Sequence, residues 1–159
     1  MSVVQRVEIV NEQSCLKIDT RKIVRLVNQV LDGENASNRG VTVLMTDDAR
    51  IRSVHARFLG KDTPTDVIAF NVGSDRPSSI VPRPSEIFPS NYLGDVIVSA
   101  ETAVRECRHY GCTAGEELRR YVVHGVLHLL GYRDKRPADV KRMRARQERY
   151  VAGFGAVRR

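Results

Sequence analysis

Two histidines and an aspartate stand in this chain at a spacing that suits metal ligands. His124 and His128 lie four residues apart in the apolar stretch VVHGVLHLLGYRDK, residues 122–135, and Asp134 follows near its end. We expect this stretch to be a helix that ends at Gly131, with both imidazoles on one face. Two imidazoles and a nearby carboxylate form a three-ligand site that leaves coordination positions for water or substrate.

The histidine pair allows two interpretations. Both side chains can be hydrogen-bonded residues of a core helix, or both can bind one metal ion, which satisfies two imidazoles that are costly to bury. We favour the metal, because two of the four histidines have this spacing and a helix end and an aspartate follow. One zinc ion suits the ligands, although iron or manganese fits them too. His55 and His109 are not assigned to the metal.

Gly125 stands where a zinc protease of the H-E-x-x-H type carries glutamate. The helix therefore supplies no adjacent general base, which weighs against a peptidase, and the sequence does not identify another base. Glycine costs about 1 kcal/mol relative to alanine inside a helix. We therefore expect a neighbouring element to approach the helix closely at this position.

The elements that must position this helix follow from periodicity, caps and breakers. Asp19 is expected to cap a helix that Gly33 ends, and Thr46 or Asp47 to cap a second one. Ser99 is expected to cap a third helix, which runs to about Tyr110. The expected strands are residues 3–10, 41–45, 67–70 and 93–98, and the expected loops are 35–39, 60–66 and the proline-rich segment 74–91.

The second half of the chain is mostly helical. Thr113 and Glu116 form a T-x-x-E capping box that opens the histidine helix, and Pro137 begins a basic helix over about 137–152. The elements together predict an α+β fold in one metal-dependent hydrolase domain, residues 1–159. It should contain a mixed sheet of roughly four strands, about five helices, and the H-x-x-x-H helix in its core.

Composition and charge restrict the class of protein further. No apolar run reaches the roughly 18 residues of a membrane span, and the N-terminus lacks a secretory pattern, so we expect a cytoplasmic protein with no membrane contact. Its three cysteines are expected to be reduced thiols. The net charge is +7. Residues 133–159 hold ten Lys/Arg against three Asp/Glu, and this excess favours either a polyanionic substrate or a solvated helix face.

Three blocks of the sequence resemble YbeY-type bacterial endoribonucleases. HGVLHLLGY, which begins at His124, is similar to the signature of that family. FLGKDTPTDVIAF, residues 58–70, resembles the family block that ends in PTDVLSF, and LGDVIVS, residues 93–99, resembles its LGDI strand. The order and approximate spacing agree over about residues 41–143.

The resemblance implies a metal-dependent hydrolase, usually with zinc, that cleaves RNA in 16S ribosomal RNA maturation and ribosome quality control. Its partners would be ribosomal RNA and ribosomal particles. The family's three histidine ligands correspond to His124, His128 and the position of Asp134, so this chain has a carboxylate in place of the third imidazole.

A second departure concerns the cleft. A family arginine that is thought to face the substrate phosphate corresponds to Leu59. Arg57, Lys61 and Arg133 are the nearby basic residues that can take its place, and ordinary solvent exposure is the alternative for them. The basic C-terminal helix is a candidate for contact with the ribosome through three arginines near one face: Arg142, Arg146 and Arg149.

The leading hypothesis is a metal-dependent endoribonuclease that acts on single-stranded RNA, with its metal on His124, His128 and Asp134. The alternatives are a metallohydrolase of another class, such as a peptidase, and a non-enzymatic ribosome-associated factor with a structural metal. An activity assay that compares cleavage of casein with cleavage of RNA separates the first alternative from the leading hypothesis. The second predicts unfolding on chelation without any cleavage by the metal-bound protein. The sequence does not predict the oligomeric state.

Overall fold

A mixed four-stranded sheet is the frame of the fold, seen in a computed structural model that describes residues 6–72 and 91–156. The strand order is β1-β2-β4-β3. β1 (Val7–Asn11), β2 (Gly40–Thr46) and β4 (Tyr92–Ser99) are parallel, and β3 (Val67–Asn71) pairs antiparallel with β4. The two inner strands are buried along their whole length, as strands covered on both faces must be.

The α+β prediction with a mixed four-stranded sheet is confirmed. The first strand begins within the predicted range and continues to Asn11. The part of that prediction at residues 3–5, and nearly all of the predicted loop 74–91, lie outside the described residues.

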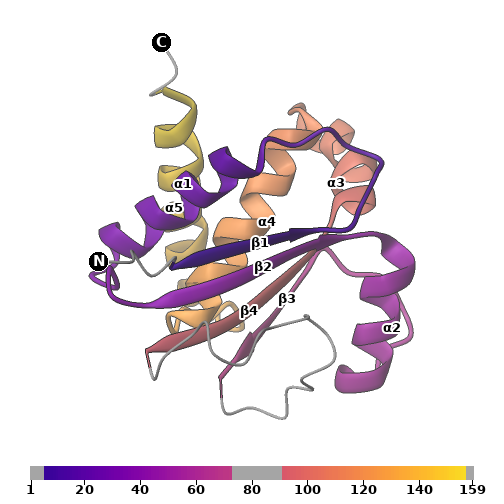
Figure 1. Ribbon diagram of the computed structural model, residues 1–159, viewed down its shortest axis with the longest axis horizontal. Helices are drawn as coiled ribbons and strands as arrows, with labels where there is room; N and C mark the ends of the chain where they lie inside the picture. Colours follow the sequence, from indigo (N-terminus) through magenta and orange to yellow (C-terminus); the bar gives the residue numbers. More distant parts are fainter. Residues whose placement is uncertain (1–5, 73–90, 157–159) are drawn as a thin grey trace, which may run out of the picture.

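Helices cover the two faces of the sheet unequally (Figure 1). α1 (Thr20–Gly33) and α4 (Ala114–Leu129) pack on one face, where alternate strand residues such as Val43 and Val96 join their core. α2 (Asp48–Leu59) covers the other face, where Leu44 and Ile97 belong to a smaller cluster. Because successive strand residues point to opposite faces, each inner strand supplies both cores.

The first two helices begin at the residues that can satisfy their free amides. Asp19 accepts a hydrogen bond from the amide of Arg21 at 3.0 Å, and Asp47, rather than Thr46, caps α2 by accepting from the amide of Arg50 at 2.8 Å. The apolar face predicted for α1 is buried throughout: Ile23, Leu26, Val27, Val30 and Leu31.

The third predicted helix is split in two. Ser99 caps α3 (Ala100–Glu106), as predicted, and the chain then continues as a 3-10 turn, η1 (Cys107–Tyr110). Gly111 ends the turn in the left-handed conformation. Cys107 and Cys112 are both free thiols, in agreement with the prediction of reduced cysteines.

α4 lies against the sheet and carries the two histidines, His124 and His128. Thr113 caps it by accepting from the amide of Glu116 at 3.1 Å. A Cβ built at Gly125 meets the side chain of Val96 on β4 and lies 3.0 Å from Val67 Cγ2 on β3, which confirms the close approach predicted there. Only a residue without a side chain lets α4 lie this near the sheet.

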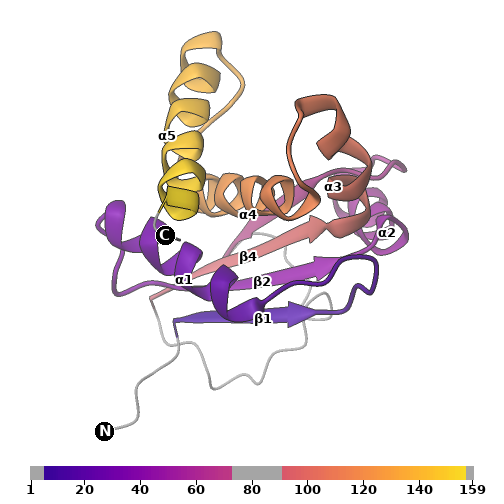
Figure 2. The ribbon, with the colours of Figure 1, turned by 90° about the horizontal axis from the view of Figure 1, so that it is seen from above.

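α5 (Pro137–Ala156) is the last helix, and it extends beyond the predicted end at about residue 152. Met143, Val151 and Phe154 are its buried residues, and the last of these lengthens the buried stripe by one turn. Figure 2 shows α3 and α5 rising on either side of α4. No helix within the described ranges has the length and apolar character that a membrane crossing requires.

Candidate metal centre and its cavity

The end of α4 turns the chain back toward the two histidines. Gly131 has φ +101°, and its amide donates to the carbonyl of His128 at 3.0 Å, while the amide of Tyr132 donates to the carbonyl of Leu127 at 3.0 Å. These two bonds form a Schellman motif, which satisfies the last helical carbonyls and reverses the chain. The reversal brings Asp134 back over the face of α4 that carries the two histidines.

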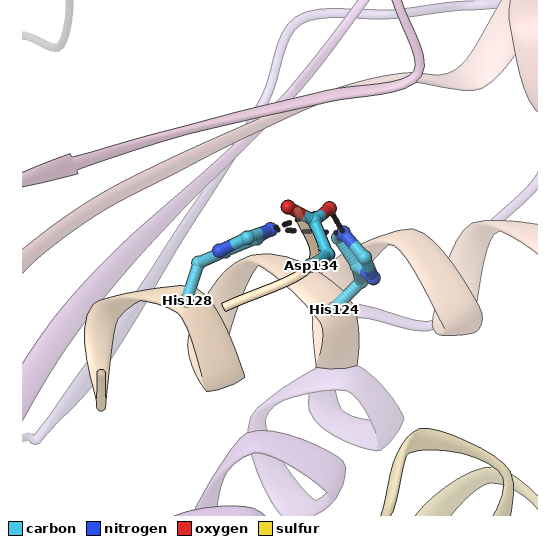
Figure 3. A group of neighbouring side chains, drawn as sticks. All are labelled: His124, His128 and Asp134. Carbon is cyan, nitrogen blue, oxygen red and sulfur yellow. Dashed lines mark hydrogen bonds and ion pairs between the residues drawn. The ribbon is translucent and has the colours of Figure 1, made fainter. Parts of the chain in front are cut away.

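His124, His128 and Asp134 point toward one common centre (Figure 3). The two Nε2 atoms are 3.1 Å apart, and Asp134 Oδ2 lies 3.3 Å from His128 Nε2 and 3.5 Å from His124 Nε2. The side chains are 26% (His124), 29% (His128) and 43% (Asp134) exposed, so solvent reaches the centre.

The outer hydrogen bonds of the imidazoles aim their lone pairs at this centre. His124 Nδ1 lies 2.8 Å from Gln147 Oε1, and His128 Nδ1 lies 3.1 Å from the carbonyl oxygen of Tyr132. Because Gln147 donates through its amide nitrogen to Glu148, its oxygen is the atom left for His124. In a neutral imidazole, an Nδ1 that donates to such an oxygen leaves Nε2 as the acceptor, with its lone pair directed at the centre.

Three possible ligand atoms that converge on one centre fit a cation. Tetrahedral ligands at about 2.0 to 2.1 Å from zinc lie about 3.3 to 3.4 Å from one another. The three separations, 3.1, 3.3 and 3.5 Å, match that spacing. The donor set also leaves room for a further ligand. This group can therefore hold a divalent ion with an open coordination position.

A cavity of about 940 Å³ opens beside this centre, with His124 and Asp134 in its wall. α3, α4 and α5 and the segment at residues 64–66 supply the lining. The lining includes three arginines and five carboxylates: Arg105, Arg120, Arg144, Asp66, Glu106, Glu117, Asp134 and Glu148. The space is large enough for a nucleotide-sized group to reach the metal ligands.

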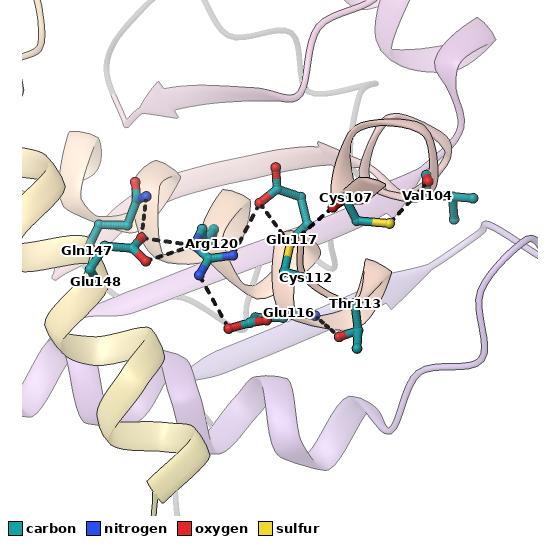
Figure 4. A network of polar contacts seen from close by, with 9 residues as sticks. All are labelled: Val104, Cys107, Cys112, Thr113, Glu116, Glu117, Arg120, Gln147 and Glu148. Carbon is teal, nitrogen blue, oxygen red and sulfur yellow. Dashed lines mark hydrogen bonds and ion pairs between the residues drawn. The ribbon is translucent and has the colours of Figure 1, made fainter. Parts of the chain in front are cut away.

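Arg120 occupies the middle of a carboxylate network between α4 and α5 (Figure 4). Its Nε lies 2.9 Å from both oxygens of Glu148, and its other nitrogens reach Glu116 at 3.3 Å and Glu117 at 3.4 Å. Burial alone would lower the pKa of the guanidinium, but the hydrogen bond and charge of Glu148 raise it well above its ordinary value. Arg120 is therefore a permanent cation one turn before His124.

Arg105 is held in the cavity from the other side. Its Nη1 donates to Asp48 at 2.8 Å, and Asp48 also accepts from the hydroxyls of Ser99 and Thr102, each at 2.6 Å. Burial alone would raise the pKa of Asp48, but these hydrogen bonds and the arginine charge lower it. The ionised Asp48 therefore fixes the start of α2 to α3 and sets the position of Arg105.

Comparison with known proteins agrees with this geometry. The family described as Endoribonuclease YbeY matches residues 8–155. The chain belongs to the YbeY family. The endoribonuclease YbeY of Moorella thermoacetica is 36% identical over 145 residues, which cover 86% of this chain and 90% of that protein. The endoribonuclease YbeY of Myxococcus xanthus is 38% identical over 117 residues, or 74% of this chain, but only 37% of the longer relative is spanned.

The fold has a known counterpart as well. The solution structure of TM1509 from Thermotoga maritima superposes with a TM-score of 0.62 at 22% identity, covering 93% of this chain and 88% of that one. At this level of identity the likeness concerns the fold.

The structure brings together the three ligands expected from the sequence, but the basic residues expected beside them are not among those that line the cavity. Arg57 is exposed on α2, lines a different hollow, and lies over the Phe58 ring at 5.2 Å. Lys61 and Arg133 are exposed and do not line the cavity. Leu59, at the family's arginine position, is also exposed and outside the lining.

Arg105, Arg120 and Arg144 are the cavity cations that sequence reasoning missed. Arg120 had a usable signal, because it precedes His124 by four residues and so shares its helix face. The other two had none, since only the packing of α3 and α5 beside α4 places them there.

The remaining histidines and helix arginines lie elsewhere. His55 is half-buried with Nδ1 2.8 Å from the carbonyl oxygen of Thr63, and His109 is exposed at the end of η1. Arg146 pairs with Glu34 at 2.9 Å, and Arg142 lies over the ring of Tyr132. Of the three arginines expected to contact the ribosome, Arg149 alone is exposed without such a contact among the described residues.

Proposed function

We propose that this chain is a metal-dependent endoribonuclease that hydrolyses phosphodiester bonds of RNA, with one zinc ion held by His124, His128 and Asp134. The observation that carries the proposal is the convergence of two Nε2 atoms and a carboxylate oxygen beside an open cavity, in a chain of the YbeY family. The similar proteins of this family are named endoribonucleases.

Ribosomal RNA as the substrate, with cleavage in 16S maturation, is the finer part of this proposal. Association with ribosomal particles and a cytoplasmic location are also part of this proposal. These parts rest on the resemblance of the three sequence blocks to the family, and on the basic charge at the C-terminal end of the chain.

Zinc at this site would supply a Lewis acid for the phosphodiester and lower the pKa of a coordinated water to about 7. The protein's own residues orient the ligands and shape the cavity. Gln147 and the Tyr132 carbonyl hold the two Nδ1 protons, which keeps each Nε2 available. Without those two acceptors, the imidazoles could rotate or change tautomer, and the three ligand atoms would no longer converge.

Two groups in the cavity wall each keep one protonation state during the reaction. Arg120 stays cationic, and its charge is taken up by Glu116, Glu117 and Glu148, so it holds α4 and α5 together beside the proposed ligands. Burial, followed by the nearby charge of Glu117, raises the pKa of Tyr121 far above its ordinary value. Tyr121 is therefore a neutral hydrogen-bond donor in the cavity and not the general base.

RNA cleavage and metal content, measured on the same preparations, test the proposal. The zinc-loaded protein should cleave a 5′-labelled RNA that has single-stranded segments, and chelation should abolish cleavage until zinc is restored. His128→Ala should lose both the bound metal and the cleavage activity, with metal content measured by elemental mass spectrometry. His109→Ala is the matched control, because that imidazole is exposed and lies outside the cavity lining, and it should behave as the parent does.

Two outcomes would contradict the proposal in different ways. Stoichiometric metal in His128→Ala would show that the ligand assignment is wrong. A zinc-loaded parent protein that cleaves no RNA, yet unfolds on chelation, would show that the metal is structural.

A further inference from the structure

A second hollow lies beside the metal cavity, along the first turns of α5. It has a volume of about 580 Å³, and we name it the α5 groove after its lining: Lys135, Pro137, Val140, Lys141, Arg144, Ala145 and Glu148. Val140, Arg144 and Glu148 line the metal cavity too, so the two hollows adjoin. The groove begins one residue after the ligand Asp134.

The charges of the two hollows differ in sign. The metal cavity has five carboxylates and three guanidinium groups in its lining. Two of its cations are already engaged, Arg105 by Asp48 at 2.8 Å and Arg120 by Glu148 at 2.9 Å. Away from the metal itself, the cavity therefore offers a polyanion little net attraction.

The α5 groove has three cations and one carboxylate in its lining. Lys135, Lys141 and Arg144 are exposed, and none of them forms an ion pair within residues 6–72 and 91–156. The one carboxylate, Glu148, is held by Arg120. Free positive charge close to the proposed metal ligands therefore lies along this groove.

The lining of the groove combines apolar and basic side chains. Pro137, Val140 and Ala145 supply apolar surface between the long basic side chains. Lys141 and Arg144 are three residues apart on α5, so they lie on one helix face and reach toward the same side. Cations that track a backbone, beside apolar surface that accepts an unpaired base, are the combination that single-stranded nucleic acid requires.

We infer that the α5 groove binds the single-stranded RNA segment next to the scissile bond, with its phosphates on Lys135, Lys141 and Arg144. The inference rests on the proposed function, and it adds the path that the strand takes away from the metal. Three phosphate contacts release three sets of counterions. Loss of the three contacts should therefore make the negative slope of log K against log salt shallower by about 2, at about 0.7 per contact for single strands.

The test is the binding of a fluorescent single-stranded RNA oligonucleotide to the full chain over a series of salt concentrations. The protein is zinc-loaded and the oligonucleotide carries phosphorothioate linkages that resist hydrolysis, so that binding is measured without cleavage. The groove variant Lys135→Ala/Lys141→Ala/Arg144→Ala should bind about tenfold more weakly or worse near 0.1 M salt, with the shallower slope. The matched control is Lys17→Ala/Arg21→Ala/Arg25→Ala, which removes the same charge from exposed residues outside both hollows. It should bind as the parent does.

Two results would overturn the inference. One is equal weakening in the groove variant and the control, because the effect would then be one of net charge alone. The other is an equal loss of binding to single-stranded RNA and to a duplex of the same sequence, because a duplex offers no unpaired base to the apolar surface of the groove. Cleavage by the zinc-loaded parent is measured separately, so a failure of the proposed function remains distinguishable from a failure of this groove.

Discussion

Asp134 Oδ2 lies 3.3 Å from His128 Nε2, although Asp134 belongs to the segment that follows the helix. The contact depends on the reversal at Gly131, which brings the chain back over α4. The third position of the ligand set is therefore supplied by the turn after the helix. A carboxylate has a shorter reach than an imidazole, yet it meets both Nε2 atoms here.

The role of Asp134 can be tested by changing its charge and then its donor type. Asp134→Asn should weaken zinc binding by more than the roughly 10- to 100-fold that the loss of an outer hydrogen-bond partner causes. Asp134→His should retain one zinc per chain, because an imidazole is also a zinc ligand. Competition with a chromophoric chelator measures both affinities. Asp62→Asn removes an equal charge in the loop after α2 and should leave zinc affinity unchanged; a similar drop there would contradict a direct role for Asp134.

Gln147 on α5 should act as a positioning residue for His124, through its oxygen 2.8 Å from Nδ1. Gln147→Met keeps the length of the side chain but removes the acceptor. Zinc affinity should fall about 10- to 100-fold, while Gln147→Glu, which restores an acceptor, should recover most of it. The free energy of unfolding without metal separates this role from a general packing effect. If both variants lose affinity equally, the hydrogen bond is not what orients His124.

Much of the fold could be predicted because local rules and tertiary packing agree. Asp19, Ser99 and Thr113 cap helices where the sequence indicates, and the apolar spacing in α1 identifies its buried face. The change to a 3-10 turn at Cys107 could not be predicted, since no residue near it breaks a helix. Such a change costs little locally, and the packing around η1 decides it.

The proposed metal ligands and the cavity differ in how far the sequence determines them. His124 and His128 share a face by helix geometry alone. Asp134 needed only a helix end at the right place, which Gly131 provides. The cations of the two hollows depend on how α3 and α5 stand beside α4, and that arrangement comes from contacts between distant segments. Arg105, for example, is positioned by Asp48, which is 57 residues away in the chain.

Gly125 should tolerate no side chain. Alanine favours a helix by about 1 kcal/mol, but the added Cβ would collide with Val96 and press on Val67, in the packed layer between α4 and the sheet. Overpacking of this kind costs about 1 to 3 kcal/mol, so Gly125→Ala should be destabilised in urea unfolding with an unchanged m-value. Gly153→Ala on α5 is the control, because nothing lies within 4 Å of its added Cβ. It should be as stable as the parent or more so, and destabilisation of both would contradict the steric explanation.

The contact between Glu34 and Tyr150 should make the protein sensitive to alkaline pH. The carboxylate of Glu34, 8% exposed, accepts hydrogen bonds from the hydroxyls of Tyr132 and Tyr150 and from Arg146, which joins the end of α1 to α5 and to the turn after α4. Burial, then the hydrogen bond and charge of Glu34, raise the pKa of Tyr150 from 10.0 to about 12. Because the folded pKa exceeds the unfolded one, the contribution of Tyr150 to stability is complete below pH 10 and is lost as the pH rises through about 12.

Urea unfolding at a series of pH values between 8 and 12 measures this effect. Tyr150→Phe should be less stable than the parent at pH 8, because Glu34 loses a donor, but its stability should fall less steeply between pH 10 and 12. Tyr110→Phe, at a position 69% exposed, should keep the parent's alkaline slope. An alkaline slope that is the same in Tyr150→Phe and in the parent would show that other groups carry the pH dependence. If only Tyr150→Phe loses the alkaline slope, the pH dependence of stability arises from the contact between Glu34 and Tyr150. That contact holds α5, and with it Gln147, beside the proposed metal ligands.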